Sequence, residues 1–271
     1  MSDKQLTLRY KLSTDKLKGK VDFFRQKYGL NLIPADFLPE KENWPLLRVT
    51  KHNLIIEHQG GNLFFHPSMA LLRMINLKRG IEDRFLQAVD LKAGDIFLDA
   101  TMGLASDALI AAWAVGQGGK VIAVEGSKLL YFLVSEGLTS LKGLKQIRNA
   151  KSEKLRAWKE LAEAASRIET VCMDHYTFLQ GLPDRSVDVV YFDPMFRDTL
   201  ADSSPSIKPL KDLSIPEPLR AEAVTEALRV ARRRVVMKER KGSGEFDRLG
   251  FKLISGGKYS NISFGIMNQG S

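Results

Sequence analysis

The stretch from Tyr191 to Phe196 reads Tyr-Phe-Asp-Pro-Met-Phe, and it decides how the rest of the chain is interpreted. It closes the apolar run Val187–Phe192, which has the composition of a strand buried on both faces of a parallel sheet. In open α/β sheets, ligands bind outside the carboxyl ends of such strands. The pattern therefore predicts a site where Asp193 is a hydrogen-bond acceptor, Pro194 restricts the turn and Phe196 offers a flat apolar face. Alone, the motif equally suits an ordinary strand-ending turn.

A second segment, Ile96–Ala108, gives that motif its weight. It reads Ile-Phe-Leu-Asp-Ala-Thr-Met-Gly-Leu-Ala-Ser-Asp-Ala, so a strand ends at Asp99 and an Ala-rich helix follows a turn containing Gly103. This pattern predicts a βα unit in which a ligand lies against bare backbone at a helix N-terminus. Its single glycine excludes a dinucleotide fingerprint, and no Gly-Lys-Ser/Thr follows as in a P-loop. Glu125 ends the next strand, where an acid commonly binds ribose hydroxyls, and Asp174 follows a third apolar segment.

Acids at the ends of three successive strands, followed by Asp-Pro-Met-Phe after the fourth, resemble class I S-adenosylmethionine-dependent methyltransferases. Asp99-Ala-Thr-x-Gly-Leu-x-x-Asp107-Ala, together with Asp193-Pro-Met-Phe, is more specifically similar to the small-subunit ribosomal RNA guanine-N2 methyltransferase J family. The resemblance covers residues 80–240. Ala105 stands where that family usually has a second glycine.

The resemblance implies a Rossmann-like α/β fold with a mostly parallel seven-stranded sheet, closed by a terminal β-hairpin. It also implies S-adenosyl-L-methionine as cofactor and methylation of an exocyclic amino group, with guanine-N2 of ribosomal RNA as the expected target. No metal is expected. The expected cofactor-binding residues are Asp99, Thr101, Gly103, Asp107, Glu125, Gly126, Asp174 and His175, and the expected catalytic residues are Asp193, Pro194 and Phe196. For His175, a solvent-facing position at a helix start is the alternative.

The net charge of +9, from 41 basic and 32 acidic residues, favours a polyanionic partner because phosphate contacts release counterions. A basic protein without such a partner would have the same composition. Basic residues concentrate in Leu141–Arg167 and Arg229–Lys241, where a solvated surface is the alternative to RNA binding. The residues expected to contact RNA or the target base are His66, Arg73, Arg79, Met195, Arg197, Arg232 and Arg233.

The remaining composition narrows the class of protein. With 44% hydrophobic and 27% charged residues, the chain resembles ordinary soluble proteins, and no apolar run is long enough to span a membrane. The start shows no signal-peptide core, so we expect a cytoplasmic protein. The single cysteine, Cys172, excludes an internal disulfide and is expected in the core.

Two regions are expected along the chain. Residues 1–79 form an N-terminal α+β region for substrate recognition, with a helix over Asp22–Tyr28 and hairpin strands at Leu46–Val49, Leu54–Glu57 and Leu63–Phe65. Residues 80–271 form the methyltransferase domain, and the proline-containing segment Arg197–Glu217 is expected to be a functional loop. The expected strands of that domain are Ile96–Asp99, Lys120–Glu125, Ile168–Cys172, Val187–Phe192 and Val235–Glu239, with a hairpin over Phe251–Ser255 and Asn261–Met267.

Two other functions compete with RNA methylation. The methyl acceptor could be DNA or a small molecule, although residues 1–79 are short for a DNA-recognition domain and a small molecule needs no basic clusters. The chain could also be a non-catalytic RNA-binding protein with the same fold. The retention of the loop glycine and of the acids at the strand ends argues against that alternative.

Overall fold

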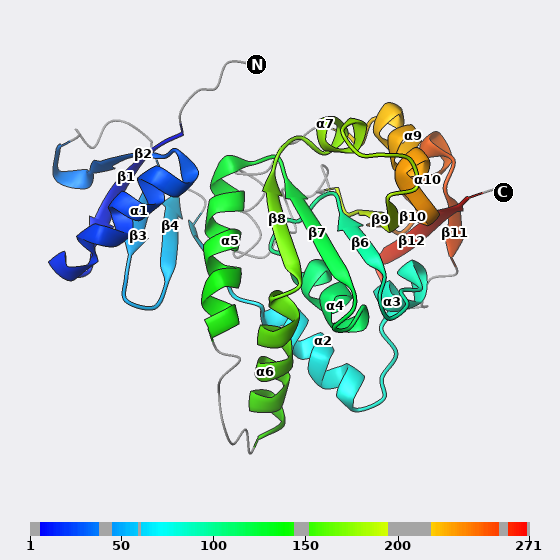
Figure 1. The fold of residues 1–271 in the computed structure, drawn as a ribbon, viewed down its shortest axis with the longest axis horizontal. Helices are drawn as coiled ribbons and strands as arrows, with labels where there is room; N and C mark the ends of the chain where they lie inside the picture. The colour runs from blue at the N-terminus through cyan, green and yellow to red at the C-terminus, as the bar shows by residue number, and fades with distance from the viewer. Residues whose placement is uncertain are drawn as a thin grey trace.

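The computed structural model describes residues 6–37, 45–58, 61–143, 152–194, 218–254 and 260–269. These residues form two β-sheets, one of five strands and one of seven (Figure 1). The smaller sheet belongs to the N-terminal region, and helix α5 (Lys128–Lys142) stands between it and the larger sheet. The larger sheet confirms the predicted Rossmann-like α/β fold.

The seven-stranded sheet has the order β11-β12-β10-β9-β6-β7-β8, in which only β12 runs antiparallel to its neighbours. The chain passes from β6 to β7 and β8 on one side, and then returns to the other side of β6 for β9 and β10. This reversal places a topological switch point at the carboxyl ends of β6 and β9, where open α/β sheets bind ligands. The strands span Ile96–Asp99 (β6), Lys120–Glu125 (β7), Ile168–Cys172 (β8), Val187–Phe192 (β9), Ala231–Arg240 (β10), Lys252–Ile254 (β11) and Ile262–Asn268 (β12).

Helices cover both faces of this sheet because successive strand residues point to opposite sides. Phe97 and Tyr191 pack into the core cluster beneath α4, α5 and α6, while Leu98 and Val190 pack into the cluster beneath α7, α9 and α10. Helix α2 packs against α4 and α6. Besides α5, the helices of this part of the chain are α2 (Ser68–Lys78), α3 (Arg84–Val89), α4 (Ser106–Ala114), α6 (Glu153–Ala165), α7 (His175–Gln180), α9 (Ala221–Val230) and α10 (Glu245–Leu249).

The N-terminal sheet has the order β2-β1-β3-β4-β5, and it is larger than the sequence predicted. The predicted hairpin is confirmed as β3 (Leu46–Val49), β4 (Leu54–His58) and β5 (Gly61–Phe64). Two strands were not predicted: β1 (Thr7–Leu12) pairs parallel with both β3 and β2 (Asn31–Pro34). The connection between them is helix α1, which begins at Lys18 rather than Asp22 and ends at Tyr28.

Aromatic side chains hold the N-terminal region against α5. The Phe24 and Tyr28 rings of α1 meet the Phe132 ring edge-on, with centroids 5.1 and 5.0 Å apart. The Tyr28 hydroxyl donates a hydrogen bond of 2.5 Å to Glu136. Phe65, just after β5, lies directly over Gly137 of α5. This close approach requires a residue without a side chain at position 137.

The prediction for Cys172 was wrong, and others fall on residues that the structure does not describe. Cys172 is exposed rather than buried, because it ends the edge strand β8. Two predicted site residues, Met195 and Phe196, lie outside the described residues, and so does the whole predicted loop Arg197–Glu217. Within the part of the chain that the structure describes, no helix is long and apolar enough to cross a membrane.

Replacing Gly137 by alanine tests the docking of the N-terminal region. A Cβ there would overlap the Phe65 ring, and such overpacking costs roughly 1–3 kcal/mol. Alanine recovers only roughly 0.5–1 kcal/mol of helix propensity, so the free energy of unfolding should fall by about 1–2 kcal/mol in urea titrations. Gly143→Ala, at the end of the same helix with open space around it, is the control. Equal stability of both variants would contradict the observed packing.

Candidate active site

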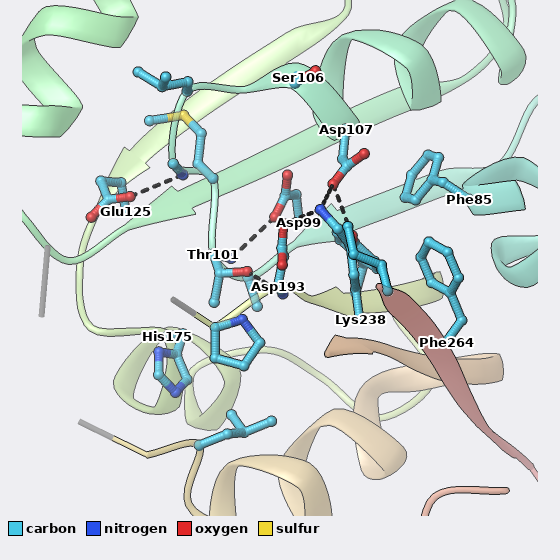
Figure 2. Close-up of a pocket in the computed structure, with 18 of the residues that line it drawn as sticks. Phe85, Asp99, Thr101, Ser106, Asp107, Glu125, His175, Asp193, Lys238 and Phe264 are labelled. Carbon is cyan, nitrogen blue, oxygen red and sulfur yellow. Dashed lines mark hydrogen bonds and ion pairs between the residues drawn. The ribbon is translucent and has the colours of Figure 1, made fainter. Parts of the chain in front are cut away.

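A cavity of about 810 Å³ opens at the carboxyl ends of β6, β7, β9 and β10 (Figure 2). Its volume lies in the range of sites that bind cofactor-sized ligands. It is the place where the acids at the strand ends meet, as the parallel sheet requires. Eleven predicted site residues line it: Arg73, Asp99, Thr101, Gly103, Asp107, Glu125, Gly126, Asp174, His175, Asp193 and Pro194.

The loop between β6 and α4 presents bare backbone to this cavity. Gly103 has φ +52°, and a Cβ built on it would meet only the Thr101 carbonyl oxygen, at 3.8 Å. The space beside this glycine is therefore open to a ligand. Ala105 adopts φ 59°, a left-handed conformation that costs a non-glycine residue roughly 1–2 kcal/mol. Glycine would adopt the same conformation without this cost.

Glu125, the last residue of β7, connects this strand to the loop between β6 and α4. One carboxylate oxygen accepts the Gly103 amide at 3.1 Å and the other accepts the Ser127 amide at 2.8 Å. Burial raises the pKa of Glu125, although these amide bonds oppose the shift. The Gly126 amide also bonds to this carboxylate, and of its roughly four acceptor positions at least one is left for a further donor. The carboxylate is therefore fixed in orientation and able to accept a hydroxyl group from a ligand.

Asp174 and His175 follow β8 at the start of α7. Asp174 caps α7 by accepting the Thr177 amide at 3.0 Å, and Arg220 lies 3.6 Å from its second oxygen. Partial burial acts to raise its pKa, but the Thr177 amide bond and the neighbouring cations hold the pKa of Asp174 below its usual value. The His175 ring meets the Phe192 ring edge-on at 5.9 Å and lines the cavity (Figure 2).

A chain of alternating charges crosses the other half of the cavity. Lys238 on β10 places its ammonium 2.5 Å from Asp193 Oδ2 and 3.2 Å from Asp107 Oδ2. On the far side of Asp107, Arg73 lies 2.5 Å from Oδ1 and forms two bonds, of 2.7 and 2.9 Å, to Asp83. Figure 2 shows the Lys238 ammonium between Asp107 and Asp193. These five side chains come from α2, α4, β10 and the residues that precede α3 and follow β9.

Backbone and hydroxyl contacts fix the ends of β6 and β9 around this chain. The Thr101 hydroxyl accepts the Asp193 amide at 2.6 Å, and Asp99 accepts the Thr101 amide at 3.1 Å. The Tyr191 hydroxyl donates to Asp107 at 2.8 Å. The loop after β6, through Thr101, therefore holds the backbone of Asp193 at the end of β9 in place.

The carboxyl groups differ in their protonation. Burial and the nearby Asp107 raise the pKa of Asp99 well above its usual value. For Asp107, burial acts in the same direction, but Lys238 and Arg73 outweigh it and hold its pKa below the usual value. Burial raises the pKa of Asp193 despite Lys238, while both carboxylates raise the pKa of Lys238 against its own burial. The cluster thus contains an ionised Asp107 beside an Asp99 that retains its proton more readily.

Four residues predicted to contact RNA lie elsewhere. His66 packs edge-on against Trp158 at 5.6 Å, and Arg79 binds both oxygens of Glu153. Arg232 and Arg233 come early in β10 and pair with Asp188 and Asp95 near the amino ends of the strands, at the edge opposite the cavity. The structure therefore places these two arginines away from the cavity, and their contact with RNA stays a prediction.

Arg73 lines the cavity, but its guanidinium pairs with Asp83 and Asp107 instead of facing outward to phosphate.

Several residues that line the cavity were not predicted from the sequence. Lys238 stands in the run Val-Val-Met-Lys-Glu, where a charge inside an apolar strand is a usable signal of a site. Within the described residues, no group of three or more His, Cys, Asp and Glu side chains is arranged to hold a metal. The other missed lining residues include Phe85, Tyr191, Ile262 and Phe264.

Comparison with known proteins relates this chain to a family of enzymes. Residues 63–247 match a family model of SAM-dependent methyltransferases. The uncharacterized protein YpiP of Bacillus subtilis is 37% identical to this chain, and the match covers 83% of this chain and 83% of YpiP. A ribosomal RNA small subunit methyltransferase J of Hahella chejuensis is 27% identical over 88% of this chain and 93% of its own. The crystal structure of a SAM-dependent methyltransferase from Neisseria gonorrhoeae, 18% identical, shares the fold with a TM-score of 0.60 over 97% of this chain and 96% of that chain.

The raised pKa of Asp99 predicts that its ionisation lowers the free energy of unfolding at neutral pH. A carboxyl whose pKa is higher in the folded state loses stability as pH rises from the unfolded-state value, near 3.9, through the folded-state value. Asp99→Asn removes this cost and should stabilise the fold at pH 7 by about 0.5–2 kcal/mol. The advantage should shrink toward pH 4, where wild-type Asp99 is protonated in the folded state and about half protonated in the unfolded state. Urea titrations at both pH values test this, and a less stable variant at pH 7 would contradict it.

Proposed function

The chain belongs to the family of S-adenosylmethionine-dependent methyltransferases, and on this premise we propose that it methylates an exocyclic amino group of a nucleic-acid base, namely guanine N2 in ribosomal RNA. The observation that carries the proposal is the Asp193 carboxylate, held at the end of β9 in the same cavity as the bare Gly103 loop. The names of the methyltransferase J relatives support ribosomal RNA as the substrate class.

The cavity fits the family's cofactor, S-adenosylmethionine. The open space beside Gly103 is a cradle that a side chain would fill. Glu125 keeps an acceptor position for a ribose hydroxyl, and Asp174 sits at the next strand end for the adenine amine. We assign Asp99, Thr101, Gly126 and His175 to the same cofactor half of the cavity. Asp107 instead accepts bonds from Arg73, Lys238 and Tyr191, so we assign it to holding the site together.

When bound, the cofactor supplies a methyl group already activated by a sulfonium. The protein's task is therefore to orient a poor nucleophile, because the lone pair of an exocyclic amine is spread into the ring. Asp193 can accept an amino hydrogen and turn the lone pair out of conjugation, while the Thr101 hydroxyl fixes the Asp193 backbone. Orientation of this kind can supply much of a catalytic barrier reduction. Once methylated, the amine is acidic, so Asp193 need only be a weak base.

Charge supports RNA as the substrate. The chain carries a net +9, and residues 1–79 contain 14 basic and 7 acidic residues. Such a surface attracts phosphates. We therefore assign the N-terminal region, with its five-stranded sheet, to substrate recognition. A base within folded RNA must be unstacked before it can enter this cavity.

Gly103→Val tests the cofactor cradle. The side chain would fill the open space and would also strain a left-handed residue by roughly 1–2 kcal/mol. We expect loss of S-adenosylmethionine binding by calorimetry with the fold retained. Gly116→Val, at the other end of α4 with φ +67° and open surroundings, carries the same strain away from the cavity and is the matched control. Binding by the Gly103 variant at wild-type affinity would refute the assignment.

Asp193→Asn separates chemistry from binding. The amide cannot serve as a negatively charged acceptor, so methyl transfer should fall by about 100- to 10,000-fold. The dissociation constant for S-adenosylmethionine should not change, because the contacts assigned to the cofactor lie on other strands. Turnover at the wild-type rate would show that Asp193 is only a strand-ending turn residue.

The substrate itself is tested with ribosomal RNA from a strain that lacks the gene. Small subunits and protein-free RNA are incubated with the enzyme and labelled cofactor, and nucleosides are then analysed by mass spectrometry. We expect N2-methylguanosine at one position, and none with Asp193→Asn. Methylation of DNA or of a small molecule alone would overturn the substrate assignment, and no methyl transfer to any acceptor would overturn the proposal itself.

A further inference from the structure

Among the residues that the structure describes, Lys238 is the cation nearest to the proposed catalytic carboxylate. It comes from β10, near the carboxyl end of a central strand of the larger sheet, and its side chain is only 19% exposed. Burying an ammonium is costly unless acids pair with it. Two do so, since its Nζ lies 2.5 Å from Asp193 Oδ2 and 3.2 Å from Asp107 Oδ2.

Neutralising Asp107 does not by itself explain this lysine. Asp107 already receives Arg73 at 2.5 Å and the Tyr191 hydroxyl at 2.8 Å. Within the described part of the chain, Lys238 is the side chain that donates to the Asp193 carboxylate, and its bond to Asp193 is the shorter of its two. The geometry therefore aims Lys238 at Asp193, with Asp107 as the support that holds the ammonium in place.

We propose that Lys238 is a positioning residue for methyl transfer, which holds Asp193 through Oδ2 so that Oδ1 is presented to the target amine. This inference rests on the proposed function. An ammonium fixed by Asp107 leaves the carboxylate one preferred orientation. The bidentate pair of Arg73 with Asp83 in turn fixes Asp107, because Arg73 bonds to both acids. The alternating chain thus connects the start of α3 to the reacting end of β9.

The lysine also sets the charge of Asp193. Burial and Asp107 raise the pKa of Asp193, while Lys238 opposes both effects. Arg73 is a second, weaker opposing charge, and Asp107 is the neighbouring acid that acts on the same group. Removing the ammonium should therefore raise the pKa of Asp193 further. The acid limb of the kcat profile, which requires ionised Asp193, should move to higher pH.

The test compares Lys238→Met with Lys238→Arg and with Lys252→Met, an exposed lysine on β11. For Lys238→Met we expect kcat to fall by about 100-fold, the size of effect that a misplaced group produces. The KM for RNA and the affinity for S-adenosylmethionine should stay near wild type. Lys238→Arg should restore the position of the acid limb and part of kcat, since it keeps the charge but not the geometry. Lys252→Met should behave as wild type.

A merely structural lysine would give a different result. Lys238→Met would then lower the melting temperature but leave kcat and the acid limb unchanged, which would overturn the proposal. If this variant does not fold, Lys238→Met is combined with Asp107→Asn, which removes one charge of each sign. Because Asp107 itself raises the pKa of Asp193, the double variant is compared with Asp107→Asn alone, and the acid limb should still lie at higher pH in the double variant.

A substrate-free measurement separates this inference from the proposed function. The carboxyl carbon of Asp193 is titrated by NMR in the wild type and in Lys238→Met. An unchanged pKa would reject the role of Lys238 whatever the enzyme methylates. A raised pKa, in an enzyme that methylates no RNA, would support the lysine's control of Asp193 and reject the RNA assignment alone.

Discussion

The buried ion pairs that run from Asp193 through Lys238, Asp107 and Arg73 to Asp83 are the constraint around which this molecule is organised. A single buried charge is strongly unfavourable, so each member of the chain requires its neighbours. Their backbones come from elements on both sides of the switch point, which must therefore meet at one place. Removing one member leaves an uncompensated charge in the protein interior. The same requirement that holds these elements together presents a carboxylate to the cavity.

Much of this arrangement is predictable from sequence because parallel strands end at one edge of the sheet. Asp99, Glu125, Asp174 and Asp193 each close an apolar run, and they do line one cavity. The role of Lys238 was not predictable in this way, because its partners stand 45 and 131 residues away and no local pattern pairs them. The sequence likewise shows basic residues in Arg229–Lys241 but not the acids that pair with the arginines of β10.

The N-terminal region shows the same limit on a larger scale. Its hairpin was visible because short apolar runs flank a glycine-rich turn, whereas β2 has four residues and ends in Pro34, as suits an edge strand. Strand β1 alternates Leu8, Tyr10 and Leu12 with polar residues, so a usable signal was present there. Aromatic packing of α1 on α5 joins this region to the larger sheet. A recognition surface carried by the region would thus have a fixed position relative to the cavity.

We propose above all that the cofactor and the target base meet in a single cavity, with Asp193 directed at the amine. The most direct measurement is a crystal structure with S-adenosylhomocysteine and an RNA fragment that contains the target guanosine. We predict the cofactor against Gly103 and Glu125, the guanine N2 within hydrogen-bonding distance of Asp193, and Lys238 still bonded to that carboxylate. A base bound with its amine away from Asp193, or a cofactor outside this cavity, would contradict the account.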